Sequence, residues 1–198
     1  MNVTLENSFP MPASAQTAWL LLQDIEAVAG CMPGARITER TDPQHYKGTV
    51  AVKFGPASMS FRGEVEVKEI DATNRTLRLV GKGTDSTGSS GAAMDLTARI
   101  EAGNETSCSL VGHSVVSMSG KAAAFGGRMM NSVADQVLKQ FAANFAAKVQ
   151  AMQANAPGTP PASGGSAGAA PPSQLNALAL AWGVFKDWLK SLFSAKKA

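Results

Sequence analysis

The sequence predicts an α+β domain in which a curved antiparallel sheet of about seven strands wraps around a long C-terminal helix, with two short helices after strand 1. Three observations lead to this architecture. Residues 35–120 alternate apolar and polar side chains with a period of two, residues 121–153 change to helical spacing, and helical spacing also follows the first strand. A linker and an amphipathic C-terminal helix are expected beyond the domain.

The first elements are short. A strand is expected at residues 3–9, before Pro10. Ser14 can cap a helix that runs to Leu22, because its side chain can accept from a free backbone N–H of the first turn. A second short helix is expected at residues 24–29.

The strands between residues 35 and 120 are separated by turns rich in Gly, Pro, Asp and Asn. Their apolar positions are predicted to share one face of the sheet: Val50, Val52 and Phe54; Met59, Phe61, Val65 and Val67; Leu77 and Leu79; Met94, Leu96 and Ile100; Leu110, Val116 and Met118. Charged residues lie between them. We therefore expect an antiparallel meander that is buried on one face and solvated on the other.

Residues 121–153 carry one apolar stripe at helical spacing. It consists of Met130, Val133, Val137, Phe141, Phe145, Val149 and Met152. A helix with such a stripe needs an apolar partner surface, and the inner face of the curved sheet is the expected one.

The C-terminal region divides into a linker at residues 154–173, rich in Pro, Gly, Ala and Ser, and an amphipathic helix at residues 174–198, after a domain at residues 1–153. The apolar run of this helix, residues 177–185, would be about 14 Å long, too short to cross a bilayer core of about 30 Å. A helix lying on the membrane surface is favoured. A protein partner and packing back onto the domain are the alternatives. The predicted membrane-binding residues are Leu178, Trp182, Phe185, Lys186, Trp188, Leu189, Lys190, Leu192 and Phe193.

The charge is unevenly distributed. Residues 1–174 contain 14 Lys and Arg and 14 Asp and Glu, whereas residues 175–198 contain four Lys and one Asp, so the whole net charge of +3 belongs to the tail. A neutral domain argues against nucleic-acid binding, which needs basic residues clustered on the folded surface. The N-terminus lacks the pattern of a secretion signal, and we expect a cytoplasmic protein attached peripherally to the inner face of the cell membrane.

Catalytic and metal-binding patterns are not recognisable. His113 is out of register with the inward residues, and His45 is expected to have no acidic neighbour in a triad-like placement. Cys31 and Cys108 lie far apart without further ligands, which predicts free thiols and no metal site. We therefore expect neither catalytic residues nor a covalently bound cofactor.

The methionines raise the question of a cavity. Met59, Met94 and Met118 take the inward register of three strands, and Met129 and Met130 begin the helix that would face them. Methionine is flexible and polarisable, so it suits an adaptable apolar cavity and equally suits gap-filling in a core.

Four motifs stand out between residue 1 and about residue 153: the turn at 30–35, Phe61-x-Gly63, Gly81-x-Gly83-x-Asp85, and Gly120 with Gly126-Gly127-Arg128 before the long helix. Together they resemble the CoxG family of carbon monoxide dehydrogenase subunits. The family is similar to the Bet v 1/START-like helix-grip superfamily, whose members enclose apolar ligands between a curved sheet and a long C-terminal helix.

The resemblance implies that this protein is a partner of a CO dehydrogenase that contains molybdenum, flavin and iron–sulfur clusters. It further implies recruitment of that enzyme to the cytoplasmic membrane and transport of a respiratory quinone, ubiquinone or menaquinone, in the helix-grip cavity. The expected lining is Trp19, Leu22, Phe54, Met59, Phe61, Met94, Met118, Phe125, Met129, Val133 and Val137. Arg128 is expected either to donate to a quinone carbonyl or to contact the enzyme.

Two other functions stay open at this point. A structural adaptor for membrane recruitment or assembly would have a filled interior and no ligand. An enzyme of the polyketide cyclase type would need an inward acid, base or tyrosine, for which Tyr46 and Asp95 are the candidates, although Asp95 falls in the outward register.

Overall fold

The computed structural model describes residues 1–55 and 57–155. In chain order the elements are β1 (Asn2–Met11), α1 (Ala15–Gln23), α2 (Ile25–Ala29), β2 (Ala35–Arg40), β3 (His45–Phe54), β4 (Ala57–Asp71), β5 (Thr76–Asp85), β6 (Ser90–Asn104), β7 (Ser107–Gly120), the 3-10 helix η1 (Lys121–Phe125) and α3 (Gly126–Ala154). The predicted linker from residue 156 onward and the predicted tail helix lie outside the described residues.

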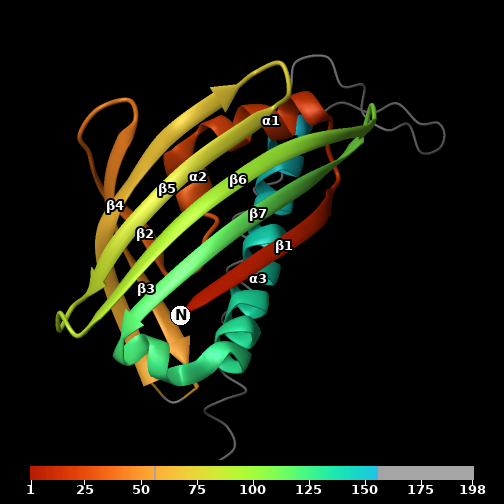
Figure 1. Cartoon of the computed structure of the whole chain (residues 1–198). Coiled ribbons are helices and arrows are strands. Elements are labelled where there is room, and N and C mark those ends of the chain that lie inside the picture. Colours follow the sequence, from red (N-terminus) through yellow and green to blue (C-terminus); the bar gives the residue numbers. More distant parts are fainter. Residues whose placement is uncertain (56, 156–198) are drawn as a thin grey trace, which may run out of the picture. The chain divides into compact units, whose positions relative to one another are not determined.

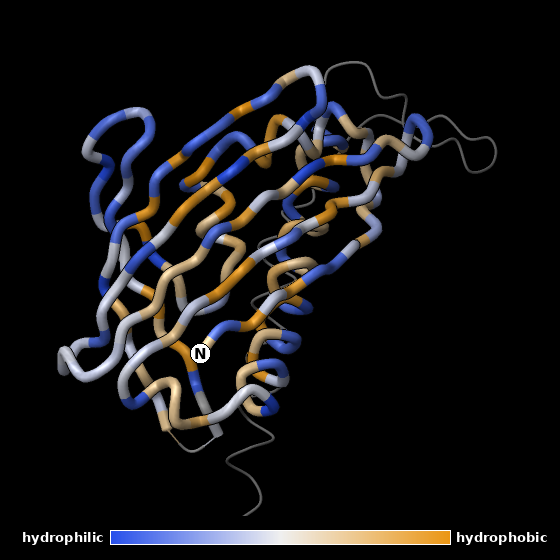
Figure 2. Tube along the Cα trace, viewed as in Figure 1, coloured by the Kyte–Doolittle hydropathy of each residue, from blue (hydrophilic) through white to orange (hydrophobic). Residues whose placement is uncertain are grey.

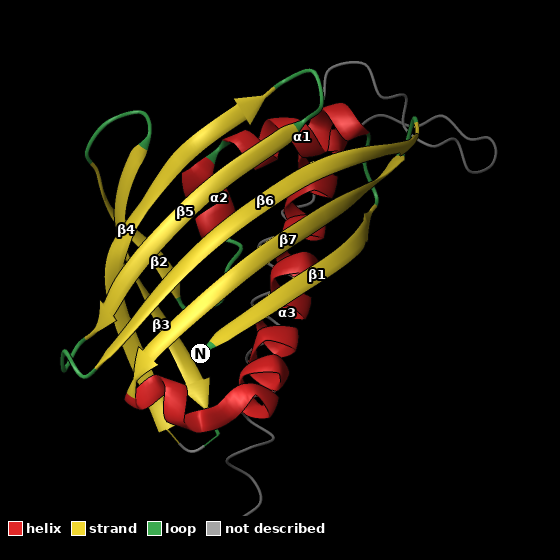
Figure 3. Ribbon diagram, in the orientation of Figure 1, coloured by secondary structure: helices red, strands yellow, loops and turns green. Residues whose placement is uncertain are grey.

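One seven-stranded sheet organises the domain. Its strand order is β1-β7-β6-β5-β4-β3-β2, and every neighbouring pair is antiparallel. The sheet is therefore a meander from β2 to β7, with β1 added beside β7. It curves around α3, and α1 and α2 lie near the C-terminal end of that helix (Figures 1 and 3). The predicted α+β architecture is confirmed.

The first strand is longer than expected. β1 continues through Pro10 to Met11, and Pro10 pairs with Ser109 of β7. Proline lacks the N–H that a central strand must donate, but β1 is an edge strand and the ladder loses little there. The two predicted helices that follow are confirmed, with Ser14 accepting from the Thr17 N–H as the cap of α1.

The long helix begins later than the spacing predicts. Residues 121–125 form the 3-10 helix η1, and α3 starts at Gly126. Positive φ angles at Gly120 (66°) and Gly126 (76°) mark the two ends of η1, a conformation that glycine adopts without a steric penalty. Phe145 and Val149 of the stripe are fully buried, but Met152 is 37% exposed, so its assignment to the buried face is wrong.

A row of glycines crosses the sheet. Gly63 of β4 pairs with Gly48 of β3 on one side and with Gly83 of β5 on the other. A Cβ atom at Gly63 would lie 2.1 Å from the Lys82 carbonyl oxygen, and one at Gly48 would lie 2.6 Å from the Arg36 carbonyl oxygen. Neighbouring backbones therefore approach too closely here for side chains, and the glycines allow the sheet to bend.

The buried apolar side chains form two clusters on the inner side of the sheet. The larger, which we call the packed core, joins α1, α2, the far half of α3 and the ends of β1, β3, β4, β5, β6 and β7 that face them. The smaller, which we call the η1-end cluster, contains the buried residues Phe61, Met118, Ala122 and Met130. Figure 2 shows the alternation of apolar and polar positions along the strands.

Candidate functional site

The η1-end cluster is the part of the interior where apolar side chains are least covered. Four buried residues, from β4, β7, η1 and α3, form its centre. Half-buried apolar side chains surround them: Val3, Val50, Val52, Met59, Ala92, Val116, Phe125 and Val133. An inward-facing apolar surface with this much residual exposure is suited to contact with an apolar ligand.

Five of the predicted lining residues meet in this cluster. They are Met59, Phe61, Met118, Phe125 and Val133. Met130, which the sequence placed on the helix stripe without assigning it to the lining, joins them. The prediction that strand methionines and the start of the long helix face one another therefore agrees with the packing of these side chains.

The remaining predicted lining residues lie elsewhere. Trp19 and Leu22 belong to the packed core, at 4% and 2% exposure, and so do not close the η1 end. Within the described residues, neither cluster includes Met94 or Val137, which are half-buried. Met129 is 38% exposed.

Arg128 and Phe54 complete the set of predicted binding residues. Arg128 lies in the first turn of α3 and is exposed, which fits a surface contact better than a hydrogen bond inside the domain. Phe54 is the last residue of β3 and pairs with Ala57; its side chain lies outside the described part of the structure.

Local hydrogen bonds fix η1 against the sheet. The Ala122 N–H donates to Ser90 Oγ at 3.0 Å, and the Ser90 N–H donates to Asp85 Oδ1 at 2.6 Å. The Thr87 hydroxyl also donates to the carboxylate of Asp85 and is the main reason that the pKa of Asp85 lies below its usual value. A buried carboxylate at the end of β5 thus positions the helix that covers one end of the η1-end cluster.

The candidates for acid–base chemistry are engaged elsewhere. The Tyr46 hydroxyl donates to the Pro43 carbonyl oxygen at 3.2 Å. Arg78 donates to both carboxylate oxygens of Asp95, at 3.1 and 2.8 Å, on the outer face of the sheet, and these bonds lower the pKa of Asp95. No specific contact favours a cyclase-type site at either residue.

The histidines also lie on the surface. His113 is exposed, as predicted, with Nε2 3.6 Å from Glu6 Oε1. The prediction for His45 was wrong: its Nδ1 lies 2.8 Å from Asp42 Oδ2, and its Nε2 lies 3.8 Å from Glu66 Oε1. The β2–β3 turn brings Asp42 back to the imidazole ring of His45. His45 and Asp42 are exposed, Glu66 is half-buried, and none of these contacts includes a nucleophilic side chain.

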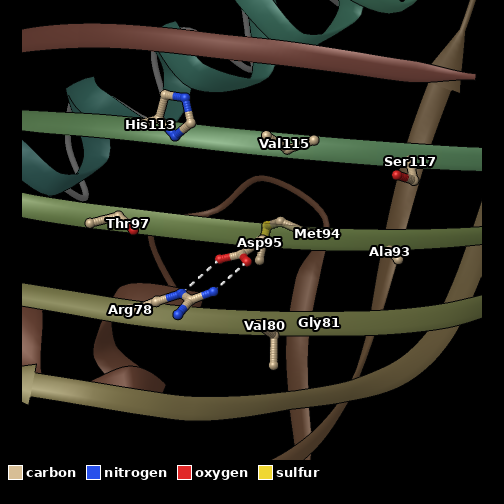
Figure 4. A pocket seen from close by; sticks show the side chains of 10 residues that line it. All are labelled: Arg78, Val80, Gly81, Ala93, Met94, Asp95, Thr97, His113, Val115 and Ser117. Carbon is tan, nitrogen blue, oxygen red and sulfur yellow. Dashed lines mark hydrogen bonds and ion pairs between the residues drawn. The ribbon is translucent and has the colours of Figure 1, made fainter.

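An open depression lies on the outer face of the sheet, over β5, β6 and β7. Figure 4 shows its lining, with the Arg78–Asp95 pair, His113 and the small floor residues Val80 and Val115. The lining of the depression mixes charged, polar and apolar side chains.

Cys31 and Cys108 are free and buried, and burial raises the pKa of both thiols. In residues 1–55 and 57–155 no group of His, Cys, Asp and Glu has the arrangement of a metal site. No helix in the same part of the chain is long and apolar enough to cross a membrane.

Comparison with protein families decides the identity of the domain. The family model for the carbon monoxide dehydrogenase CoxG subunit matches residues 8–150, most of the chain. The chain belongs to this family. The CoxG family is a family of accessory subunits, and the resemblance seen in the turn and glycine motifs is thereby confirmed. No curated protein matches the chain in sequence.

Solved structures support the fold of this CoxG family member. A conserved protein from Geobacillus kaustophilus is 18% identical, with a TM-score of 0.67, over 76% of this chain and 96% of that one. A START superfamily protein from Mycobacterium smegmatis is 16% identical, with a TM-score of 0.55, over 75% and 98%. The Zhui aromatase/cyclase from Streptomyces sp. R1128 is 14% identical, with a TM-score of 0.55, over 76% and 94%. At these identities the likeness concerns the fold alone.

Proposed function

We propose that this CoxG family member carries a respiratory quinone between the cytoplasmic membrane and a molybdenum-containing CO dehydrogenase, and recruits that enzyme to the membrane. The observation that supports the carrier role is the η1-end cluster. Its inward apolar side chains come from four elements and keep partial exposure, whereas the packed core at the other end is closed. A quinone ring and its isoprenoid chain are apolar ligands of the kind that such a surface accommodates.

Membrane recruitment is assigned to the tail. The spacing of residues 174–198 predicts an apolar helical face, and the segment carries four lysines; both features favour binding at an anionic lipid surface. Within the linker, the 17 residues from 157 to 173 would reach roughly 22 Å if flexible. This reach allows the domain to exchange ligand with the bilayer while it remains attached.

The carrier role is tested by extraction. Residues 1–155 are purified without detergent, incubated with a short-chain quinone and extracted with solvent, and the extract is analysed by mass and absorbance. Stoichiometric quinone is expected. Its absence, both with and without the incubation, would contradict the carrier role and leave a structural adaptor without ligand.

A substitution locates the ligand. Met118 is 7% exposed and lies at the centre of the η1-end cluster. Met118→Trp is expected to fill the space and abolish quinone uptake while circular dichroism shows a folded domain. Unchanged uptake would remove Met118 from the site. A matched control is Met152→Trp, at an exposed position of α3.

Deletion of residues 174–198 tests the tail. The shortened chain is expected to stay in solution with anionic vesicles that sediment the full chain. Persistent sedimentation would place the lipid-binding surface on the domain.

A further inference from the structure

One polar side chain in the interior has no partner. Ser114 lies in the middle of β7, is 8% exposed, and its Oγ is the only buried side-chain nitrogen or oxygen among the described residues without a hydrogen bond. A buried hydroxyl without a partner is costly, so folded proteins rarely keep one unless something else satisfies it. Ser114 therefore points to a group that is absent from the protein alone.

Ser114 belongs to the inward face of the sheet. It alternates with Leu110 and Met118, which are buried on that face. Its partners across the ladder are Leu96 of β6 and Leu5 of β1. Leu96 packs against the packed core, whereas Val116, the next inward residue of β7, packs in the η1-end cluster. The unpartnered hydroxyl thus lies at the junction of the two clusters.

A second polar side chain and open space lie beside it. Asn7 of β1 is half-buried in the inward register, opposite Gly112, and is diagonal to Ser114, about 7–8 Å away between Cα atoms. Among the hydrogen bonds of the described residues none involves the Asn7 amide group. A Cβ atom at Gly112 would find only Leu96 Cδ1, at 4.0 Å. The floor between the two polar groups is therefore open.

We infer that Ser114 is the hydrogen-bond donor for a carbonyl oxygen of the bound ligand, and that the ligand enters with its ring first. This inference rests on the proposed carrier function. The ring lies over Gly112, with Asn7 as a second donor, and the apolar chain runs past Val116 to Met118. Ser114 and Met118 are four strand residues apart, about 13 Å at about 3.3 Å per residue, so a ring at Ser114 leaves its chain at the η1 end.

The inference makes opposite predictions for stability and binding. Ser114→Ala removes a buried hydroxyl that has no partner, so the ligand-free variant is expected to melt at the same temperature as the wild type or higher. The same variant is expected to bind a quinone about five- to tenfold more weakly, the loss of one hydrogen bond. A serine with a purely structural role would lower the melting temperature instead.

The experiment uses the full chain and two probes, 2-methyl-1,4-naphthoquinone and 2-methylnaphthalene, which share a ring system but differ in the carbonyl oxygens. Equilibrium dialysis compares the wild type, Ser114→Ala and the control Ser117→Ala, on the same strand but on the outer face. The expected result is weaker binding of the quinone by Ser114→Ala alone, with equal binding of the hydrocarbon by all three proteins.

The outcomes separate the two proposals. Equal quinone binding by Ser114→Ala and Ser117→Ala overturns the inference but leaves the carrier function intact. Failure of the wild type to bind either probe or a long-chain quinone contradicts the carrier function itself. Gly112→Val supplies a second variant: it fills the open space without a forbidden backbone conformation, and it is expected to abolish binding of both probes while the protein remains folded. Retained binding would place the ring elsewhere.

Discussion

The two ends of the interior are built differently from the same sheet. In the packed core, α1, α2 and α3 all cover the sheet, and residues such as Phe145 and Val149 are completely excluded from solvent. At the other end, among the described residues, η1 and the first turns of α3 cover it, and most apolar side chains keep partial exposure. The difference supports the proposed division of labour, in which one end provides stability and the other provides a surface for a ligand.

The largest expected effect compares two phenylalanines. Phe145→Ala in the packed core is expected to lower the free energy of unfolding by about 3–5 kcal/mol, because it leaves a closed cavity. Phe61→Ala in the η1-end cluster is expected to cost about half as much, since its half-buried neighbours can relax or admit water. Urea denaturation measures both. Equal losses would remove the contrast between the two ends.

The next effect concerns the bend in the sheet. Gly63→Ala is expected to cost about 1–3 kcal/mol, because the new methyl group would meet the Lys82 carbonyl oxygen at 2.1 Å, and backbone cannot yield as a flexible side chain can. Gly81→Ala is the matched control on the adjacent strand. Its nearest neighbours would be at 3.6 Å, an ordinary contact, so its unfolding midpoint should move little. A neutral Gly63→Ala would show that the bend does not depend on the glycine row.

The smallest effect concerns the turn that holds η1. The pKa of Asp85 is lowered in the folded state, chiefly by the Thr87 hydroxyl, so its ionised form stabilises the fold. This contribution is complete above the unfolded-state pKa of about 4 and is lost as the pH falls through the lower folded-state pKa. Asp85→Asn is therefore expected to lower the melting temperature by a few degrees at pH 7.

The pH dependence provides the control for that prediction. The difference in melting temperature between Asp85→Asn and the wild type should shrink as the pH falls below about 4, because the Asp85 carboxyl is protonated first in the unfolded state and, at lower pH, in the folded state. A difference that is constant from pH 7 to pH 3 would mean that the carboxylate charge does not stabilise the turn.

The sequence predicts those features that depend on local periodicity. The period-two alternation placed residues such as Phe61 and Met118 on the inner face, and the structure packs them together there. The predicted end of β1 before Pro10 was wrong because β1 lies at the edge of the sheet, where a proline is tolerated. That edge position follows from the strand order, which the sequence does not display. Met152 was wrongly included in the buried stripe of α3, because the helical pattern of apolar residues continues beyond the buried part of the helix.

Features that depend on cross-strand register could not be predicted. Gly48, Gly63 and Gly83 are far apart in sequence and become neighbours only when the strands pair. Ser114 did leave a signal, since it interrupts an apolar alternation between Leu110 and Met118. Whether its hydroxyl has a partner, however, depends on side chains from other strands.

The pairing of β1 with β7 also has a consequence for how the chain folds during synthesis. The backbone groups of Met1 bond to those of Met118, so the first strand made is completed only by the last strand of the sheet. The meander from β2 to β6 can form from neighbours as it leaves the ribosome, but β1 must wait for more than a hundred residues. Such long-range closure is expected to slow folding, and it leaves the N-terminal strand without its partner until β7 emerges.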